Sequence, residues 1–215
     1  MPSRTLIVAA VAGVLAAAGA VVFLLTRPET GPSPAYFRGE GTSALYAPIA
    51  TRGQDPAPLT EQELFGQAAR LVEQGVTMER RGAALSADCG EALWGSGVKA
   101  AAAGCAGVAR ASFTGAGGAV SGQYAVFDMP DGAAADRLVA ALDPRRGGGF
   151  LRAAPGQPPS FDAGHSRAAA RALGHFVVVN WVGPVGDERT ADLTLPQLAL
   201  ERLGAFAQRR VLAAG

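Results

Sequence analysis

Three residue types that carry much of protein chemistry are scarce in this chain of 215 residues. It has two histidines, two cysteines and a single lysine, Lys99. Histidine and cysteine supply most zinc ligands and many nucleophiles and general bases, so few sites of these kinds can be built. The two cysteines also lie far apart in the sequence, which excludes the C-x-x-C spacing of redox and zinc motifs.

An excess of charge of either sign is missing as well. The chain has 19 basic and 18 acidic residues, for a net charge of +1. No basic face is indicated, so nucleic acid is not an expected partner. Nearly all the basic residues are arginine, and alanine and glycine are abundant. This bias is typical of a genome rich in G and C, and it hints at a bacterial origin.

Charged side chains are absent from one long stretch near the N-terminus. Residues 5–25 contain none, and Arg4 and Arg27 bound the run. As a helix rising 1.5 Å per residue, about 21 residues span roughly 32 Å, enough to cross the hydrocarbon core of a bilayer. We therefore predict a short tail over residues 1–4 and a transmembrane helix over residues 5–26, with the lipid bilayer as its partner.

A cleaved signal peptide is the alternative interpretation of this stretch. Small residues at 16–18 and at 18–20 fit the pattern that signal peptidase recognises. Cleavage there would leave the apolar run 21–25 as a new N-terminus, so we favour an uncleaved signal anchor. Lysine and arginine counts beside the helix do not decide its orientation.

The cysteine pair bears on the orientation. An even number of cysteines in an exported domain indicates a disulfide, here between Cys89 and Cys105. Closing a loop of about 15 residues stabilises a fold by roughly 3 kcal/mol in the chain-entropy model. Two buried free thiols, acting as small apolar side chains, are the alternative. We favour the disulfide, and with it a single-pass protein of the cell membrane whose C-terminal domain is extracytoplasmic.

The remainder of the chain divides into a linker and one domain. Residues 27–59 are rich in proline and glycine and predict a linker, although the apolar patch 44–49 could lie on the domain or on the membrane surface. Residues 60–215 form the predicted domain. Thr60 and Glu63 make a capping box ahead of an apolar stripe, which predicts a helix that ends at Gly75.

Strand and helix patterns alternate through the rest of the domain. Period-two patterns predict strands over 108–114 and 120–129. A nearly continuous apolar run after Gly174 predicts a hairpin over 166–173 and 175–182, and weaker strands are predicted at 77–85 and 150–153. Further helices are predicted from Asp88 to Gly104, from Asp131 to Asp143, and from Leu195 toward the C-terminus. This mixture predicts the α+β class: a transmembrane helix followed by one small domain, with a mainly antiparallel sheet packed by helices.

The sequence Asp162, His165, Ser166 invites comparison with a catalytic triad. Neighbouring side chains on a strand point to opposite faces, however, and no G-x-S-x-G motif surrounds the serine. Triads are recognised by geometry rather than by sequence proximity. We therefore assign no catalytic, cofactor-binding or metal-binding residue, and we expect His175 to be structural. Trp94, His165 and His175 are kept as candidates for contact with a ligand or partner.

Five blocks of sequence carry a familiar pattern. They are residues 41–50 with Arg52, 59–65, 88–95, 104–105 and 174–182. Together they resemble a family of uncharacterised single-pass membrane proteins of actinobacteria. The resemblance covers nearly the whole chain, and it implies no activity, ligand or catalytic residue.

These observations favour a non-enzymatic, membrane-tethered extracytoplasmic module that binds an envelope protein or another envelope component. One alternative is a membrane-tethered enzyme, hydrolase-like, that uses His165 or His175. A second alternative is a structural subunit of a membrane complex. In that case the small residues at positions 9, 13, 16, 17 and 20 would allow close packing of the anchor helix.

Overall fold

The computed structural model describes residues 29–66, 69–188 and 190–214. The predicted tail and the predicted transmembrane helix over residues 5–26 therefore lie outside the described residues. Across the three described ranges, no helix combines the length and the apolar character needed to cross a membrane.

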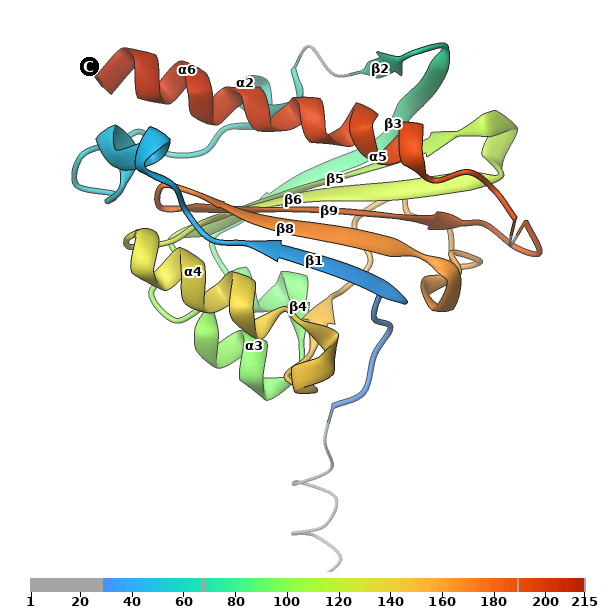
Figure 1. The fold of residues 1–215 in the computed structure, drawn as a ribbon, viewed down its shortest axis with the longest axis horizontal. Helices are drawn as coiled ribbons and strands as arrows, with labels where there is room; N and C mark the ends of the chain where they lie inside the picture. Colours follow the sequence, from blue (N-terminus) through green and yellow to red (C-terminus); the bar gives the residue numbers. More distant parts are fainter. Residues whose placement is uncertain (1–28, 67–68, 189, 215) are drawn as a thin grey trace, which may run out of the picture.

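One seven-stranded sheet runs through the middle of the domain (Figure 1), in the order β1-β8-β9-β6-β5-β3-β2. The strands are β1 (Tyr36–Glu40), β2 (Arg70–Glu73), β3 (Val76–Ser86), β5 (Gly107–Gly115), β6 (Val120–Asp128), β8 (Arg167–Leu173) and β9 (Phe176–Pro184). Every neighbouring pair is antiparallel except β1 and β8, which are parallel. The predicted α+β class with a mainly antiparallel sheet is confirmed.

Helices cover both faces of this sheet (Figure 1). One face carries α3 (Ser96–Ala101), α4 (Gly132–Ala141) and a small ribbon of β4 (Leu93–Trp94) and β7 (Phe150–Leu151), whereas the other carries α2 (Glu61–Phe65), α5 (Thr194–Glu201) and α6 (Ala205–Ala214). Short 3-10 turns connect these elements: η1 (Ala44–Ile49), η2 (Cys89–Ala92), η3 (Ala116–Gly118), η4 (Pro144–Arg146), η5 (Ala163–His165) and η6 (Arg202–Gly204).

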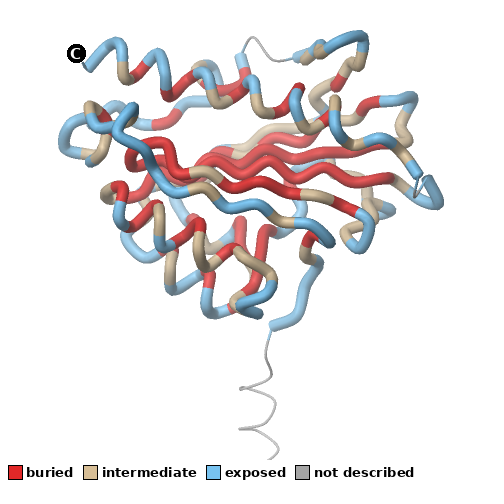
Figure 2. Tube along the Cα trace, in the orientation of Figure 1, coloured by how far each residue is buried: buried red, intermediate tan, exposed pale blue. Residues whose placement is uncertain are grey.

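The sheet separates two hydrophobic cores, and its central strands are buried throughout (Figure 2). Alternation along β6 places Ala125 and Phe127 in the first core, beneath α4, and Tyr124 and Val126 in the second core, beneath α5 and α6. This division of the strand agrees with the period-two prediction, because successive side chains of a strand point to opposite faces.

The segment predicted as a linker over residues 27–59 belongs to the domain from Tyr36 onward. β1 extends the sheet beside β8, and Ile49 and Leu59 lie in the second core. These apolar side chains follow no regular spacing and are separated by prolines and glycines, so neither helical nor strand periodicity revealed them. The linker prediction is corrected for residues 36–59.

The helix predicted from Thr60 to Gly75 is also shorter than expected. Its start is confirmed, because the Thr60 hydroxyl accepts the backbone N–H of Glu63 at 3.1 Å. The helix ends at Phe65, and β2 then forms a hairpin with β3 through a turn at Gln74 and Gly75, both with positive φ. Strand pairing with β3 therefore replaces the predicted second half of the helix.

The helix predicted from Asp88 to Gly104 is divided into η2, β4 and α3. The break falls at Gly95, whose φ of +88° lies outside the helical region. A Cβ atom at this position would lie 2.4 Å from the carbonyl oxygen of Gly148, so only glycine fits. By contrast, α4 begins as predicted, with the Asp131 carboxylate accepting the N–H of Ala134 at 2.7 Å.

Candidate functional site

Trp94, one of the predicted contact residues, is covered by the chain's own N-terminal segment. Its indole Nε1 donates to the carbonyl oxygen of Pro32 at 2.9 Å. Gly31 lies against the ring so closely that a Cβ atom there would lie 2.7 Å from it. The tryptophan therefore serves as a platform for residues 31–32.

An ion cluster fixes the residue that precedes this platform. The Glu29 carboxylate accepts from Lys99 Nζ at 2.8 Å and from the backbone N–H of Gly95 at 3.0 Å, and it also pairs with Arg152. The hydrogen bond from Lys99, followed by the bond from Gly95, lowers the pKa of Glu29 to about 2. We call residues 29–32 with Trp94, Lys99 and Arg152 the N-terminal clamp.

His165, the second predicted contact residue, lies on the surface and forms no triad. Its Nδ1 is 2.7 Å from the Asp162 carboxylate, and this hydrogen bond lowers the pKa of Asp162. The Ser166 hydroxyl is buried and faces elsewhere: it donates to the carbonyl oxygen of Ala163 at 2.7 Å and accepts from Trp181 Nε1 at 2.6 Å. Histidine and serine thus bind different partners, although His165 lies in the 3-10 turn η5 and not on the predicted strand.

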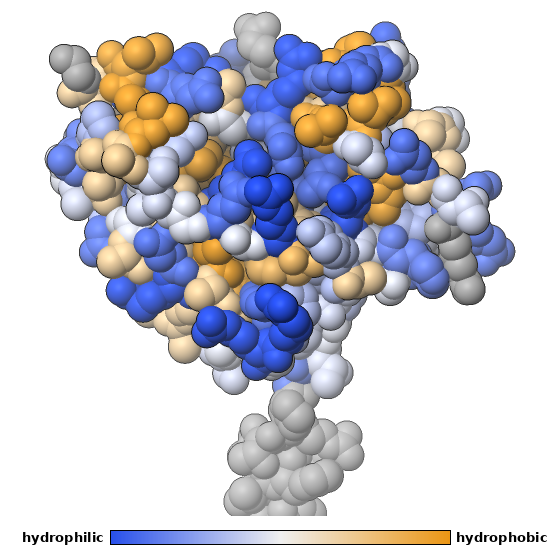
Figure 3. Space-filling model, in the orientation of Figure 1, coloured by the Kyte–Doolittle hydropathy of each residue, from blue (hydrophilic) through white to orange (hydrophobic). Residues whose placement is uncertain are grey.

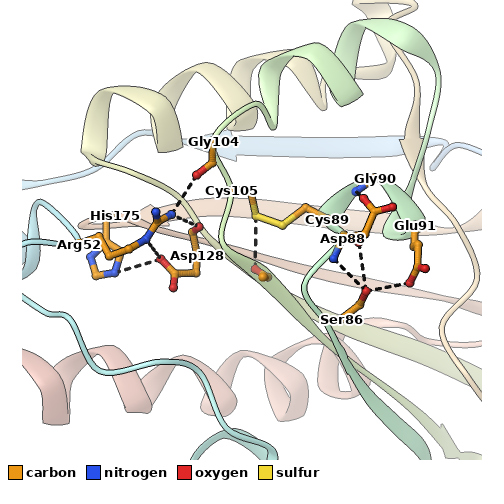
Figure 4. Close-up of a disulfide and its surroundings, with 11 residues drawn as sticks. Arg52, Ser86, Asp88, Cys89, Gly90, Glu91, Gly104, Cys105, Asp128 and His175 are labelled. Carbon is orange, nitrogen blue, oxygen red and sulfur yellow. Dashed lines mark hydrogen bonds and ion pairs between the residues drawn. A yellow bond between two sulfur atoms is a disulfide. The ribbon is translucent and has the colours of Figure 1, made fainter.

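His175, the third predicted contact residue, is fully buried at the turn between β8 and β9 (Figure 4). Its Nδ1 lies 2.8 Å from the carbonyl oxygen of Ile49, and its Nε2 lies 3.5 Å from Asp128 Oδ1. Arg52 Nε donates to the same Asp128 oxygen at 3.0 Å. Burial lowers the pKa of His175, against the opposing effects of Ile49 and Asp128. These contacts join the turn to η1.

The predicted disulfide between Cys89 and Cys105 is confirmed, with 6.2 Å between the two Cα atoms (Figure 4). It joins η2 to the segment that follows α3, at the edge of the first core. Beside it, the Ser86 hydroxyl donates to Glu91 at 2.8 Å, and the Asp88 carboxylate caps η2 through Gly90 N–H at 2.8 Å. Trp94, His165 and His175 do not meet here or elsewhere.

A small polar pocket lies on the other face of the sheet, where the C-terminal helix is interrupted. Its volume is about 180 Å³, and it is enclosed by η1, by strands β6, β8 and β9, and by η6 between α5 and α6. We call it the Tyr124 pocket. The polar side chains that line it include those of Tyr46, Tyr124, Arg171, Asn180 and Glu201.

The hydroxyl of Tyr124 lies at the floor of this pocket without a partner. The residue is 1% exposed, and no described residue makes a hydrogen bond to its oxygen. Burial raises the pKa of Tyr124 well above its usual value, so the hydroxyl stays protonated and acts as a donor. An unpaired buried polar group is rare in native proteins because it loses its hydration without compensation.

Charged and amide groups line the sides of the Tyr124 pocket. Arg171 Nε is 2.9 Å from Glu40, and its Nη2 is 3.8 Å from Glu201, which is too long for a hydrogen bond. Asn180 accepts from Gln197 Nε2 at 2.9 Å through Oδ1, so its amide NH₂ can donate. The pocket therefore offers three donors and the acceptor Glu201 to a small polar molecule.

Sequence reasoning did not find this pocket, although two signals mark it. Asn180 interrupts the apolar run of β9, and Gly204 interrupts the final helix. A Cβ atom at Gly204 would lie 3.6 Å from the Tyr124 hydroxyl, so the glycine leaves this side of the pocket open. Each signal alone also fits an ordinary core, and only the folded chain places the two together.

No metal centre is supported by the described residues. Within residues 29–66, 69–188 and 190–214, no group of three or more histidine, cysteine, aspartate or glutamate side chains could hold a metal ion. The Tyr124 pocket is also smaller than the roughly 300–1,000 Å³ typical of drug-sized ligand sites. Its size suits a small polar molecule.

Comparison with known proteins adds no relative. No protein-family model, curated protein or solved structure matches this chain.

Proposed function

We propose that the protein is a membrane-anchored, non-enzymatic binding module of the cell envelope, with its domain outside the cytoplasm and a small polar ligand in the Tyr124 pocket. The anchor is the helix predicted over residues 5–26, which would make this a single-pass protein of the cell membrane. The apolar run supports the anchor because its length matches a bilayer core.

The disulfide supports the extracytoplasmic location. Disulfides persist in oxidising compartments and are rare where thiol reductants dominate. Cys89 and Cys105 are joined, and no free cysteine remains in the described part of the chain.

The single observation that carries the binding proposal is the unpartnered Tyr124 hydroxyl. A ligand that accepts a hydrogen bond from this donor would compensate for the lost hydration of the group, so binding is favoured at this point. Because burial keeps the phenol protonated, the tyrosine suits recognition rather than proton abstraction. Arg171, Asn180 and Glu201 would fix the orientation of the ligand.

The location is tested in intact cells with a thiol reagent that cannot cross membranes. After mild reduction, we expect Cys89 and Cys105 to react from outside the cell, and the full chain to remain in the membrane after alkaline extraction. Labelling only in lysed cells, or release of the chain by extraction, would contradict the proposed anchoring and orientation.

The ligand site is tested with the full chain in detergent and the variant Tyr124→Phe, which removes one oxygen atom. Without ligand, this variant should be as stable as the parent or slightly more stable, because it deletes an unsatisfied group. A panel of free amino acids, small polyols and monosaccharides is then screened by thermal shift.

We expect at least one compound of this panel to raise the Tm of the parent chain and of the control Tyr36→Phe, since Tyr36 is 57% exposed outside the pocket. The same compound should have a much smaller effect on Tyr124→Phe. If no compound raises the Tm, or if all three chains respond equally, the Tyr124 pocket is not the ligand site.

A further inference from the structure

We infer that the surface around the N-terminal clamp rests on the lipid headgroups and recognises anionic lipids. This anchor-proximal surface comprises the clamp and the loop 145–149. The inference rests on the proposed anchor, and it concerns a surface on the opposite face of the sheet from the Tyr124 pocket (Figure 1).

Only a short length of chain separates the predicted anchor from the clamp. Leu25 is the last apolar residue of the predicted anchor, and Glu29 is already held by Lys99, Arg152 and the N–H of Gly95. Four residues span at most about 14 Å when fully extended. The headgroup layer takes up roughly 5–8 Å of this on each side of a bilayer. The domain therefore has no room to stand away from the membrane.

The contacts of Gly95 identify which surface meets the lipid. Gly95, whose N–H binds Glu29, packs against the loop 145–149: a Cβ atom at Gly95 would lie 2.4 Å from the carbonyl oxygen of Gly148, and Val98 N–H donates to that oxygen at 3.0 Å. The chain leaves the domain toward its N-terminus beside α3 and β4 (Figure 1). The loop is thus a neighbour of the exit point.

Basic side chains are in excess on the anchor-proximal surface. Arg145 and Arg146 are exposed on this loop; Arg145 pairs with Asp143 at 2.7 Å, and no ion pair joins Arg146 to another described residue. In the clamp, Lys99 and Arg152 share the single carboxylate of Glu29. Basic groups thus outnumber acidic groups four to two. Strongly hydrophilic side chains also gather on the lower part of the view, over the side of the sheet that carries α3 and α4 (Figure 3). An excess of positive charge close to a bilayer attracts anionic headgroups.

The proximity of the anchor-proximal surface to the lipid headgroups is measured with the full chain in lipid nanodiscs. A spin label is attached at Ser96→Cys, an exposed position of α3 next to Gly95 and beside the anchor-proximal surface, or at Leu212→Cys, an 82% exposed position near the end of α6. Collisions of the label with nickel-chelating lipid headgroups are recorded. We expect frequent collisions at position 96 and few at position 212.

The recognition of anionic lipid is measured after the short connection is relaxed. An insertion of 20 Gly/Ser residues after Pro28 removes the length constraint, so that only attraction keeps the surface at the bilayer. The label at position 96 should then keep its collisions in phosphatidylglycerol discs and lose them several-fold in phosphatidylcholine discs. Salt at 1 M, or Arg145→Gln with Arg146→Gln, should remove the difference, because these changes screen or delete the charges.

The possible failures are distinguishable. A chain that does not incorporate into discs overturns the proposed anchor. If the chain without the insertion enters the discs but its label at position 96 makes few collisions, the inferred contact of this surface with the headgroups is wrong. Equal behaviour of the inserted chain in both lipids overturns the recognition of anionic lipid.

Discussion

Arg210 is a charged residue that joins separate segments inside the second core. Its guanidinium is 8% exposed and binds the carboxylates of Asp55 and Glu63, together with the carbonyl oxygens of Ala57 and Pro58. These bonds tie residues 55–58 and α2 to α6. The local sequence pattern does not reveal this connection, because the partners of Arg210 lie in segments far apart in the chain.

Replacing Arg210 should therefore be costly. We expect Arg210→Ala to lower the free energy of unfolding by about 3–5 kcal/mol, since the buried Asp55 carboxylate loses its partner. The neighbouring Arg209 is exposed and makes one bond of 3.3 Å, to the carbonyl oxygen of Glu63, so Arg209→Ala should cost at most about 1 kcal/mol. Urea unfolding of both variants measures the difference, and similar losses would contradict the connector role.

His175 gives the domain a dependence on pH. Burial lowers its pKa below the value near 6.5 of an unfolded histidine, so the unfolded chain binds the extra proton more readily. This contribution to stability is present above pH 6.5 and is lost as the pH falls below it, by at most about 1.4 kcal/mol per pH unit.

We expect urea unfolding at pH 7.5 and pH 5.5 to show this loss in the parent chain. His175→Asn, whose amide can still donate toward Ile49, should show a smaller loss between the same two pH values. An unchanged difference would mean that other groups produce the pH dependence.

At the scale of elements, two glycines with similar φ angles allow the cost of backbone strain to be distinguished from the cost of steric overlap. Gly95 has a φ of +88° and Gly75 a φ of +86°, yet only Gly95 has backbone atoms of the loop 145–149 within 3 Å of a built Cβ. We expect Gly75→Ala to cost about 1 kcal/mol through strain alone, and Gly95→Ala to cost at least about 2 kcal/mol more because Gly148 must move. Thermal unfolding of the two variants tests the comparison, and equal costs would show that the loop yields easily.

The elements that the sequence predicted well are those with strong local patterns. Both hairpins and the capped helix α4 follow from alternation, from turn glycines and from Asp131. The failures depended on contacts that the local pattern does not show. Hairpin pairing of β2 with β3 replaced the second half of the helix predicted from Thr60 to Gly75, and the approach of the distant Gly148 fixed the break at Gly95. Local propensity is a weak prior that tertiary contacts override.

At the scale of the whole molecule, both candidate surfaces are formed by residues far apart in sequence. The N-terminal clamp joins Glu29 to Lys99 and Arg152, and the Tyr124 pocket joins η1 to the break in the C-terminal helix. The sequence did not mark Lys99, the only lysine, for this role, because local patterns do not show which carboxylate it meets. Trp94 was identified as unusual from the sequence, but the folded chain shows that its partner is the N-terminal segment itself.

The disulfide relates the stability of the domain to the oxidising compartment proposed for it. Cys89 and Cys105 are 16 residues apart, and closing a loop of this size stabilises the fold by roughly 3 kcal/mol through the lost entropy of the unfolded chain.

We expect Cys89→Ser with Cys105→Ser to lower the free energy of unfolding by about 2–4 kcal/mol in the absence of reductant. Reductant should lower the stability of the parent by a similar amount and leave the double variant unchanged. Because the free energy of unfolding of a domain is only about 5–15 kcal/mol in total, a loss of this size would make folding depend on an oxidising environment. A parent chain that is equally stable with the bond reduced would remove this link, and with it the strongest physical reason to place the domain outside the cytoplasm.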